Sequence, residues 1–278
     1  MTTPQAPKLT QPLRDLAAWT AFFKGTDIPV LGETAQAIEL LRANEDRVDA
    51  NSLGEMIAQD PLMSLKLLAY SATHRSERVV TDVETVTSAL VMMGISPFFR
   101  TFGPQPTVDD HLHDEPEALR GLHDTLQRAH RGANYALSFA VHRMDHDAAI
   151  IHTAALLHDF CDMLLWCHAP ALCMRIGALQ RADPGLRSTA AQRAVLGIEL
   201  ADLQQALMKA WRLPELLVQI SDDRHADHAK VRTVMLALRL ARHSAHGWDN
   251  PALPDDIAEI ADLLNLSPAA TLTLVHDA

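Results

Sequence analysis

Apolar residues recur every three or four positions along much of the chain, which is the spacing that places side chains on one face of a helix. The clearest run has large apolar residues at intervals of 4, 3, 4 and 4: Leu196, Leu200, Leu203, Leu207 and Trp211. Thr189 and Gln192, just before it, have the spacing of a capping box. The run therefore predicts one helix that ends near Pro214 and buries its apolar stripe.

Capping residues mark the ends of other helices. Asp60 before Pro61 predicts a helix start, because aspartate accepts from the first free N–H groups and proline fits the first helical position. Thr81 and Glu84 form a second capping box, and Gly94 can close the helix that follows.

The same patterns predict helices over most of the remaining chain, at about 117–143, 150–168, 231–243 and 254–265, with a short one after Ser267. The chain has only 11 glycines and 5% aromatic residues, and its apolar residues are mostly Leu, Ala, Ile, Val and Met. This composition favours helix over sheet, so we predict an all-α fold, a helical bundle.

Three segments lack helical periodicity. Residues 1–17 contain three prolines and are expected to be a flexible leader, and residues 28–31 are expected to be an extended apolar plug. The acidic, proline-rich segment around 104–116 is expected to be an exposed seam between two lobes, at about 18–103 and about 117–278.

Charge and cysteine content narrow the class of protein. The net charge of −11 repels a phosphate backbone, so we expect no nucleic acid partner. No apolar run approaches the roughly 20 residues of a membrane span, and no export signal precedes the helices, so we expect a cytoplasmic protein without membrane contact. The three cysteines lack Cys-x-x-Cys spacing, which favours reduced thiols as core filler: Cys161, Cys167 and Cys173.

His158 and Asp159 stand side by side among leucines and alanines. They resemble the pair of HD-type metal-dependent phosphohydrolases, in which a first His, a His-Asp pair and a distant Asp converge on a divalent ion that activates water. His130 is the candidate first ligand, but the helix at 231–243, where the fourth is expected, has no acidic residue and carries Leu238 in that place. We therefore expect a vestigial site that holds no metal and no other cofactor.

The order and spacing of five blocks over roughly residues 20–225 resembles the HDOD domain, the HD-related output domain of bacterial signalling proteins: IAQDPLMSLKLLAYSA, VTDVETVTSALVMMGI, LQRAHRGANYALSFAV, HTAALLHDF and LGIELADLQQALMKAWRLPE. The resemblance implies an all-helical regulatory domain at 18–225, on whose second lobe the helices of 226–278 pack. The sequence departs from the family at Tyr70, at Phe160-Cys161 and at the SDDRHADH stretch. Each departure makes a functional metal site less expected.

The resemblance implies a non-catalytic signalling module that acts through a protein partner. The alternatives are a divalent-metal phosphohydrolase acting on nucleotides or cyclic dinucleotides, and a small-molecule receptor near His130. His158 and Asp159 are expected to be a buried packing pair, so that Asp159→Asn keeps the fold nearly intact. Other polar clusters are expected to be simply exposed: Asp109, Asp110, His111, His113 and Asp114; His142 and His146; Asp222, Asp223, His225 and His228.

Overall fold

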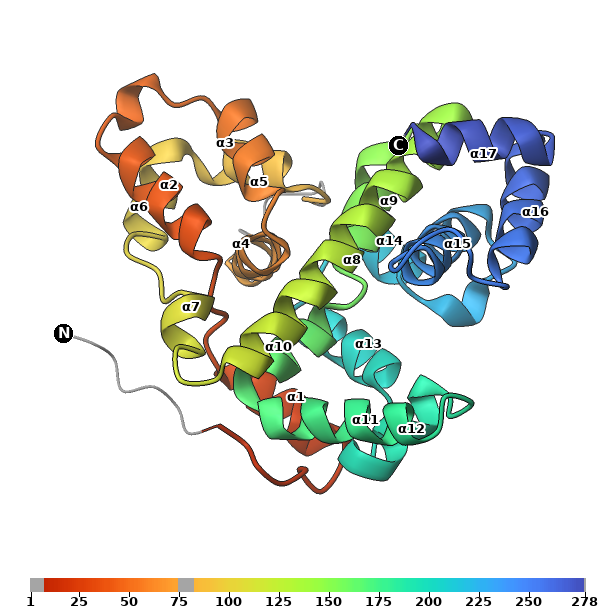
Figure 1. Ribbon diagram of the computed structural model, residues 1–278. Coiled ribbons are helices and arrows are strands. Elements are labelled where there is room, and N and C mark those ends of the chain that lie inside the picture. Colours follow the sequence, from red (N-terminus) through yellow and green to blue (C-terminus); the bar gives the residue numbers. More distant parts are fainter. Residues whose placement is uncertain (1–7, 75–82, 278) are drawn as a thin grey trace. The chain divides into compact units, whose positions relative to one another are not determined.

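The structure is a computed structural model that describes residues 8–74 and 83–277. Its regular elements are helices, which confirms the all-α prediction, and the described residues contain no strand beyond a single bridge between Val30 and Thr107 (Figure 1). The α-helices are α1 (Leu16–Gly25), α2 (Gly32–Arg42), α3 (Ala50–Ile57), α4 (Pro61–Thr73), α5 (Val86–Met93), α6 (Ile95–Thr101), α7 (Val108–His111), α8 (Pro116–His142), α9 (Ala148–Leu156), α10 (Phe160–His168), α11 (Pro170–Ala182), α12 (Ser188–Leu196), α13 (Leu200–Ala210), α14 (Glu215–Ile220), α15 (Ala229–His243), α16 (Leu253–Leu264) and α17 (Pro268–His276). Two short 3₁₀ turns accompany them, η1 (Glu45–Arg47) and η2 (Asp223–His225).

The helices form two compact units, each built from two stretches of chain. The first unit comprises the chain up to Thr125 together with Phe160–Leu213. The second comprises Leu126–Asp159 together with the chain from Pro214 onward. This division differs from the expected seam at 104–116, because α10 packs on α4 and α13 packs on α1, which joins residues 160–213 to the N-terminal helices.

The core of the first unit lies where α1, α10 and α13 meet. Trp19 and Phe23 of α1 are buried and stacked on each other, and the Trp19 indole N–H donates to the carbonyl oxygen of Leu196 over 3.3 Å. Leu203 and Leu207 of α13 are fully buried, as the apolar stripe predicts.

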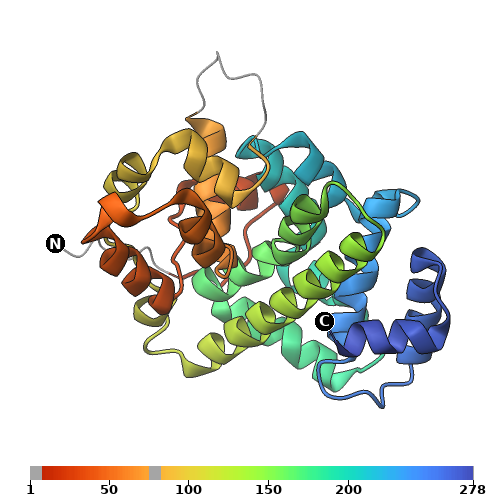
Figure 2. The same ribbon diagram turned by 90° about the horizontal axis from the view of Figure 1, so that it is seen from above.

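The second unit contains the C-terminal part of α8 with α9 and α14–α17. Helix α15 packs on α9 and on α16, and α16 packs on α17, seen in dark blue in Figure 2. Gly132 lets α8 approach α15 closely, since a Cβ atom there would lie 2.6 Å from Cδ2 of Leu238. The C-terminal helices thus belong to the unit that holds the His-Asp pair.

Several predicted helix ends are confirmed. The Asp60 carboxylate accepts from the backbone N–H groups of Leu62 and Met63 at 2.9 and 3.0 Å, and α8 covers the predicted long helix. Gly94 closes α5 at a φ of +84°, which an L side chain rarely adopts.

Other predicted ends are wrong. Helix α5 starts with a capping box of Thr85 and Ser88, whereas the predicted cap Thr81 lies outside the described residues. The single helix predicted from Thr189 to Trp211 is two helices, because Gly197 adopts a left-handed conformation with a φ of +74°. Gln192 accepts through its side chain from the N–H of Leu200, at the start of α13.

The expected leader and seam are more ordered than predicted. Residues 1–7 lie outside the described residues, but Leu9 donates to the carbonyl oxygen of His168 over 2.7 Å, and α1 begins at Leu16. The segment 104–116 is not simply exposed, because it contains α7 and pairs with the buried extended segment around Val30. In this pairing the N–H of Val108 donates to the carbonyl oxygen of Val30.

One apolar stretch, Ala148–His168, is long enough to cross a membrane by length and composition, contrary to the sequence-based estimate. Its mean hydropathy is 1.4, and 67% of the window is buried inside the protein. The stretch is the pair α9 and α10, so burial within the two units accounts for its apolar character.

Candidate functional site

The His-Asp pair lies in a turn, and not within one helix as predicted. Helix α9 ends at Leu156, α10 begins at Phe160, and the residues between them form a turn in which the N–H of Leu157 donates to the carbonyl oxygen of Thr153. The side chains of His158 and Asp159 are only 14% and 20% exposed. The turn thus presents two polar side chains in a mostly apolar setting, where each needs a partner.

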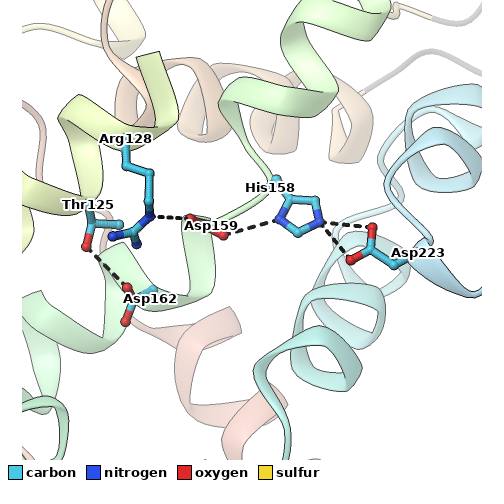
Figure 3. Close-up of polar contacts among 6 residues, drawn as sticks. All are labelled: Thr125, Arg128, His158, Asp159, Asp162 and Asp223. Carbon is cyan, nitrogen blue, oxygen red and sulfur yellow. Dashed lines mark hydrogen bonds and ion pairs between the residues drawn. The ribbon is translucent and has the colours of Figure 1, made fainter. Parts of the chain in front are cut away.

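Those partners form a line of alternating charges, Arg128–Asp159–His158–Asp223, which we call the ion-pair chain (Figure 3). The Arg128 Nε lies 3.2 Å from Asp159 Oδ2, and Asp159 Oδ1 lies 3.2 Å from His158 Nδ1. The His158 Nε2 lies 3.1 and 3.2 Å from the two carboxylate oxygens of Asp223. Both ring nitrogens of His158 therefore face carboxylates.

The carboxylates keep His158 protonated. Burial alone would lower its pKa, but hydrogen bonds and charge attraction from Asp159 and Asp223 outweigh burial and raise the pKa of His158 from 6.5 to about 10. For Asp159, burial would raise the pKa, but its hydrogen bond to His158 and the charges of His158, Arg128 and Arg242 hold that pKa well below its usual range. His158 and Asp159 are thus both charged at neutral pH.

The surroundings of His158 are unsuited to metal binding. An imidazole binds a metal through a ring-nitrogen lone pair, whereas both ring nitrogens of His158 face carboxylates at hydrogen-bonding distance. Within residues 8–74 and 83–277, no three His, Cys, Asp or Glu side chains are placed to hold a metal ion together. The residues present do not fit the ion of an HD-type site.

His130 is half-buried on α8, where its charge adds to burial in lowering the pKa of His152. Arg128 lies two residues earlier, about 200° away around the helix, and its guanidinium contacts Asp159. Leu238, the residue expected in place of the fourth ligand, is buried against Gly132. A cationic side chain therefore neutralises Asp159 where the HD resemblance implies a metal ion.

Sequence reasoning missed Arg128 and assigned Asp223 to an exposed stretch. Asp223 begins η2 just after α14, which packs on α9, and this packing carries its carboxylate to the turn. Its neighbour Asp222 pairs instead with Arg224, whose Nε lies 2.8 Å away. No local sequence pattern distinguishes these two aspartates, because the difference arises from tertiary packing.

Another expectation, that His111 lies in an exposed loop, is also wrong. Its ring is buried edge-to-face against His168, with 4.9 Å between ring centroids. His113, His142 and His146 are exposed, as expected. The three cysteines are free and buried, which confirms their assignment to the core, and burial raises the pKa of Cys167 to about 12.

Stability should depend on alkaline pH through His158. Because folding raises its pKa, its stabilising contribution is complete below pH 6.5 and is lost as pH rises through about 10. The contribution of Asp159, whose pKa is lowered, is instead lost in acid. Urea unfolding at pH 6.5 and about pH 10 should show this alkaline loss in the wild type and a smaller loss in Asp223→Asn. Equal losses in both proteins would contradict the assigned role of Asp223.

Comparison with known proteins identifies the family to which the sequence belongs. The HDOD domain model matches residues 28–226. Similar solved structures include the MmoQ response regulator of Methylococcus capsulatus, with 19% identity and a TM-score of 0.64 over 90% of this chain and 98% of that one. A virulence factor of Campylobacter jejuni has 15% identity and a TM-score of 0.62 over 94% and 97% of the two chains.

An HDOD domain protein of Geobacter sulfurreducens has 14% identity and a TM-score of 0.51 over 94% of this chain and 93% of that one. No curated protein matches the chain by sequence. At these identities the structural likeness concerns the fold, whereas the domain match extends over more than half of the sequence. The chain belongs to the HDOD family.

Proposed function

We propose that this HDOD protein is a non-catalytic regulatory module of bacterial signal transduction, acting in the cytoplasm through contact with another protein. The observation that carries the proposal is the pairing of both His158 nitrogens with carboxylates. A general base or a metal ligand needs a lone pair that such an imidazolium lacks. The response regulator among the similar structures is compatible with a signalling role.

The free state of the buried cysteines supports the proposed location, since thiols persist in a reducing compartment. A charged pair that is fixed in place rather than available for chemistry favours a regulatory role over a catalytic one. The competing function is metal-dependent hydrolysis of a phosphodiester or nucleotide. It predicts the opposite results when metal content and turnover are measured.

Purified protein should therefore contain no stoichiometric divalent metal, and EDTA should leave its Tm unchanged, because no native-state ligand is removed. Phosphodiesterase and nucleotidase assays with Mn²⁺ should give equal background rates for the wild type and for His158→Ala. Stoichiometric metal, together with turnover that disappears in His158→Ala, would establish the hydrolase instead. Circular dichroism of the variant should accompany the assays, so that loss of fold is not mistaken for loss of a catalytic group.

A further inference from the structure

Two buried histidines of the first unit lie against each other, and we call them the histidine pair. His111 is the last residue of α7, and His168 is the last residue of α10. Their rings meet edge-to-face with 4.9 Å between centroids, and the two residues are only 8% and 3% exposed. The rings of Phe22 and Phe23 of α1 pack on His168. An imidazolium in these surroundings would lose much of its hydration, so the packing favours neutral rings.

A proton on the histidine pair also meets repulsion. Burial lowers the pKa of His111, and it lowers the pKa of His168 from 6.5 to about 4. The ammonium group of Lys8 repels a charge on either ring and adds to both effects. Among the residues that the structure describes, none accepts a hydrogen bond from His168 Nε2, so a proton on that nitrogen would be buried without an acceptor. Protonation therefore works against the closed packing of the pair.

The carboxylates that attract a charge on the pair are already bound to lysines. Asp27 acts on both rings, and its Oδ1 lies 2.7 Å from Lys66 Nζ. Glu115 acts on the ring in α7, and its Oε1 lies 2.7 Å from Lys8 Nζ. The Cys167 thiol stays neutral, because burial raises its pKa to about 12. These groups balance one another, so a proton on the pair adds an uncompensated positive charge.

The neighbour of the pair that opens at the lowest cost is the N-terminal segment 8–13, which we call the strap. Its Lys8 pairs with Glu115, and the N–H of Leu9 donates to the carbonyl oxygen of His168 over 2.7 Å. The strap belongs to no helix, and residues 10–12 are exposed. Helices α1 and α10, by contrast, contribute buried side chains to the core. A segment with few buried contacts opens locally more easily than a core helix.

We propose that the strap is released by acid, leaving the first unit when the histidine pair takes up protons. Release removes the ammonium group of Lys8 and lets water reach the imidazolium rings. Glu115, freed from Lys8, can then pair with the protonated ring of His111, which it already attracts. Because closure lowers the pKa of both histidines below 6.5, the closed strap is favoured above that pH and is progressively lost as the pH falls below it. This inference goes beyond the proposed function, since it gives the module a response to mild acidification.

Amide hydrogen exchange of the full-length protein tests the proposal, with the N–H of Leu9 as the reporter. Protection factors, which remove the pH dependence of intrinsic exchange, are compared at about pH 7.5 and about pH 5.5. Protection of Leu9 should fall about tenfold for each histidine that recovers a pKa of 6.5 on opening. Combining His111→Gln with His168→Gln should remove this fall. The matched control is His113→Gln, at a side chain that is 64% exposed just after α7, and it should keep the fall.

The proposal is overturned if Leu9 is equally protected at both pH values, or if the double variant shows the same fall as the wild type. It is also overturned if Leu9 and Trp19 of α1 have equal protection factors at the lower pH, because the unit then opens as a whole and not at the strap. Should the double variant fail to fold, these two wild-type comparisons still decide. Metal content and turnover are measured at neutral pH, where the strap is closed, so this proposal and the proposed function can fail separately.

Discussion

Asp159→Ala is expected to lower the free energy of unfolding by about 2–4 kcal/mol, because it leaves Arg128 and His158 as neighbouring cations without their shared carboxylate. The estimate lies toward the low end for a broken buried pair because Asp159 is 20% exposed. Urea unfolding at neutral pH measures the loss.

Asp159→Asn should also destabilise the protein, by about 1–2 kcal/mol, because the amide keeps an acceptor but loses the charge that Arg128 and His158 neutralise. The sequence-based expectation of a nearly unchanged Asn variant treated the residue as a neutral packing partner, and the ion-pair chain revises it. Asp124→Ala, an exposed aspartate on α8, is the matched control and should change stability by less than about 0.5 kcal/mol. An Asn variant as stable as the wild type would contradict the charged state assigned to His158.

Leu207→Ala should cost about 2–5 kcal/mol, because it leaves a cavity at a fully buried position in α13, which packs on α1 and α10. Lys209→Ala, two residues later on the exposed side of the same helix, should cost less than about 0.5 kcal/mol. Denaturant melts of the two variants measure the difference. Similar midpoints for both variants would show that the buried face of α13 has been assigned incorrectly.

The sequence predicted best the features whose causes lie close along the chain. Asp60 caps α4 through N–H groups two and three residues later, so its partners could be predicted without the fold. The division between α12 and α13 was missed because the apolar spacing continues across Gly197, and only the left-handed backbone there shows that the helix stops.

The contacts of the candidate site are likewise of two kinds, between residues close along the chain and between residues far apart. The contact of His158 with Asp159 joins adjacent residues, whereas Asp223 lies 65 residues from His158 and Arg128 lies 31 residues from Asp159. Their approach depends on helices packing together, which apolar periodicity predicts only in outline. Because charged residues on helix surfaces and in loops are common, no local pattern identified Arg128 or Asp223 as partners of the pair.

The interleaving of the two units has a consequence for biosynthesis. Once the ribosome has translated Leu213, every residue of the first unit has been synthesised, but only Leu126–Asp159 of the second. Until Pro214 and the residues after it emerge, the apolar faces of α9 lack α14 and α15, which cover them in the finished protein. The nascent chain therefore exposes apolar surface of α9 while the second unit is still incomplete, and chaperone binding or aggregation would compete with folding during this interval.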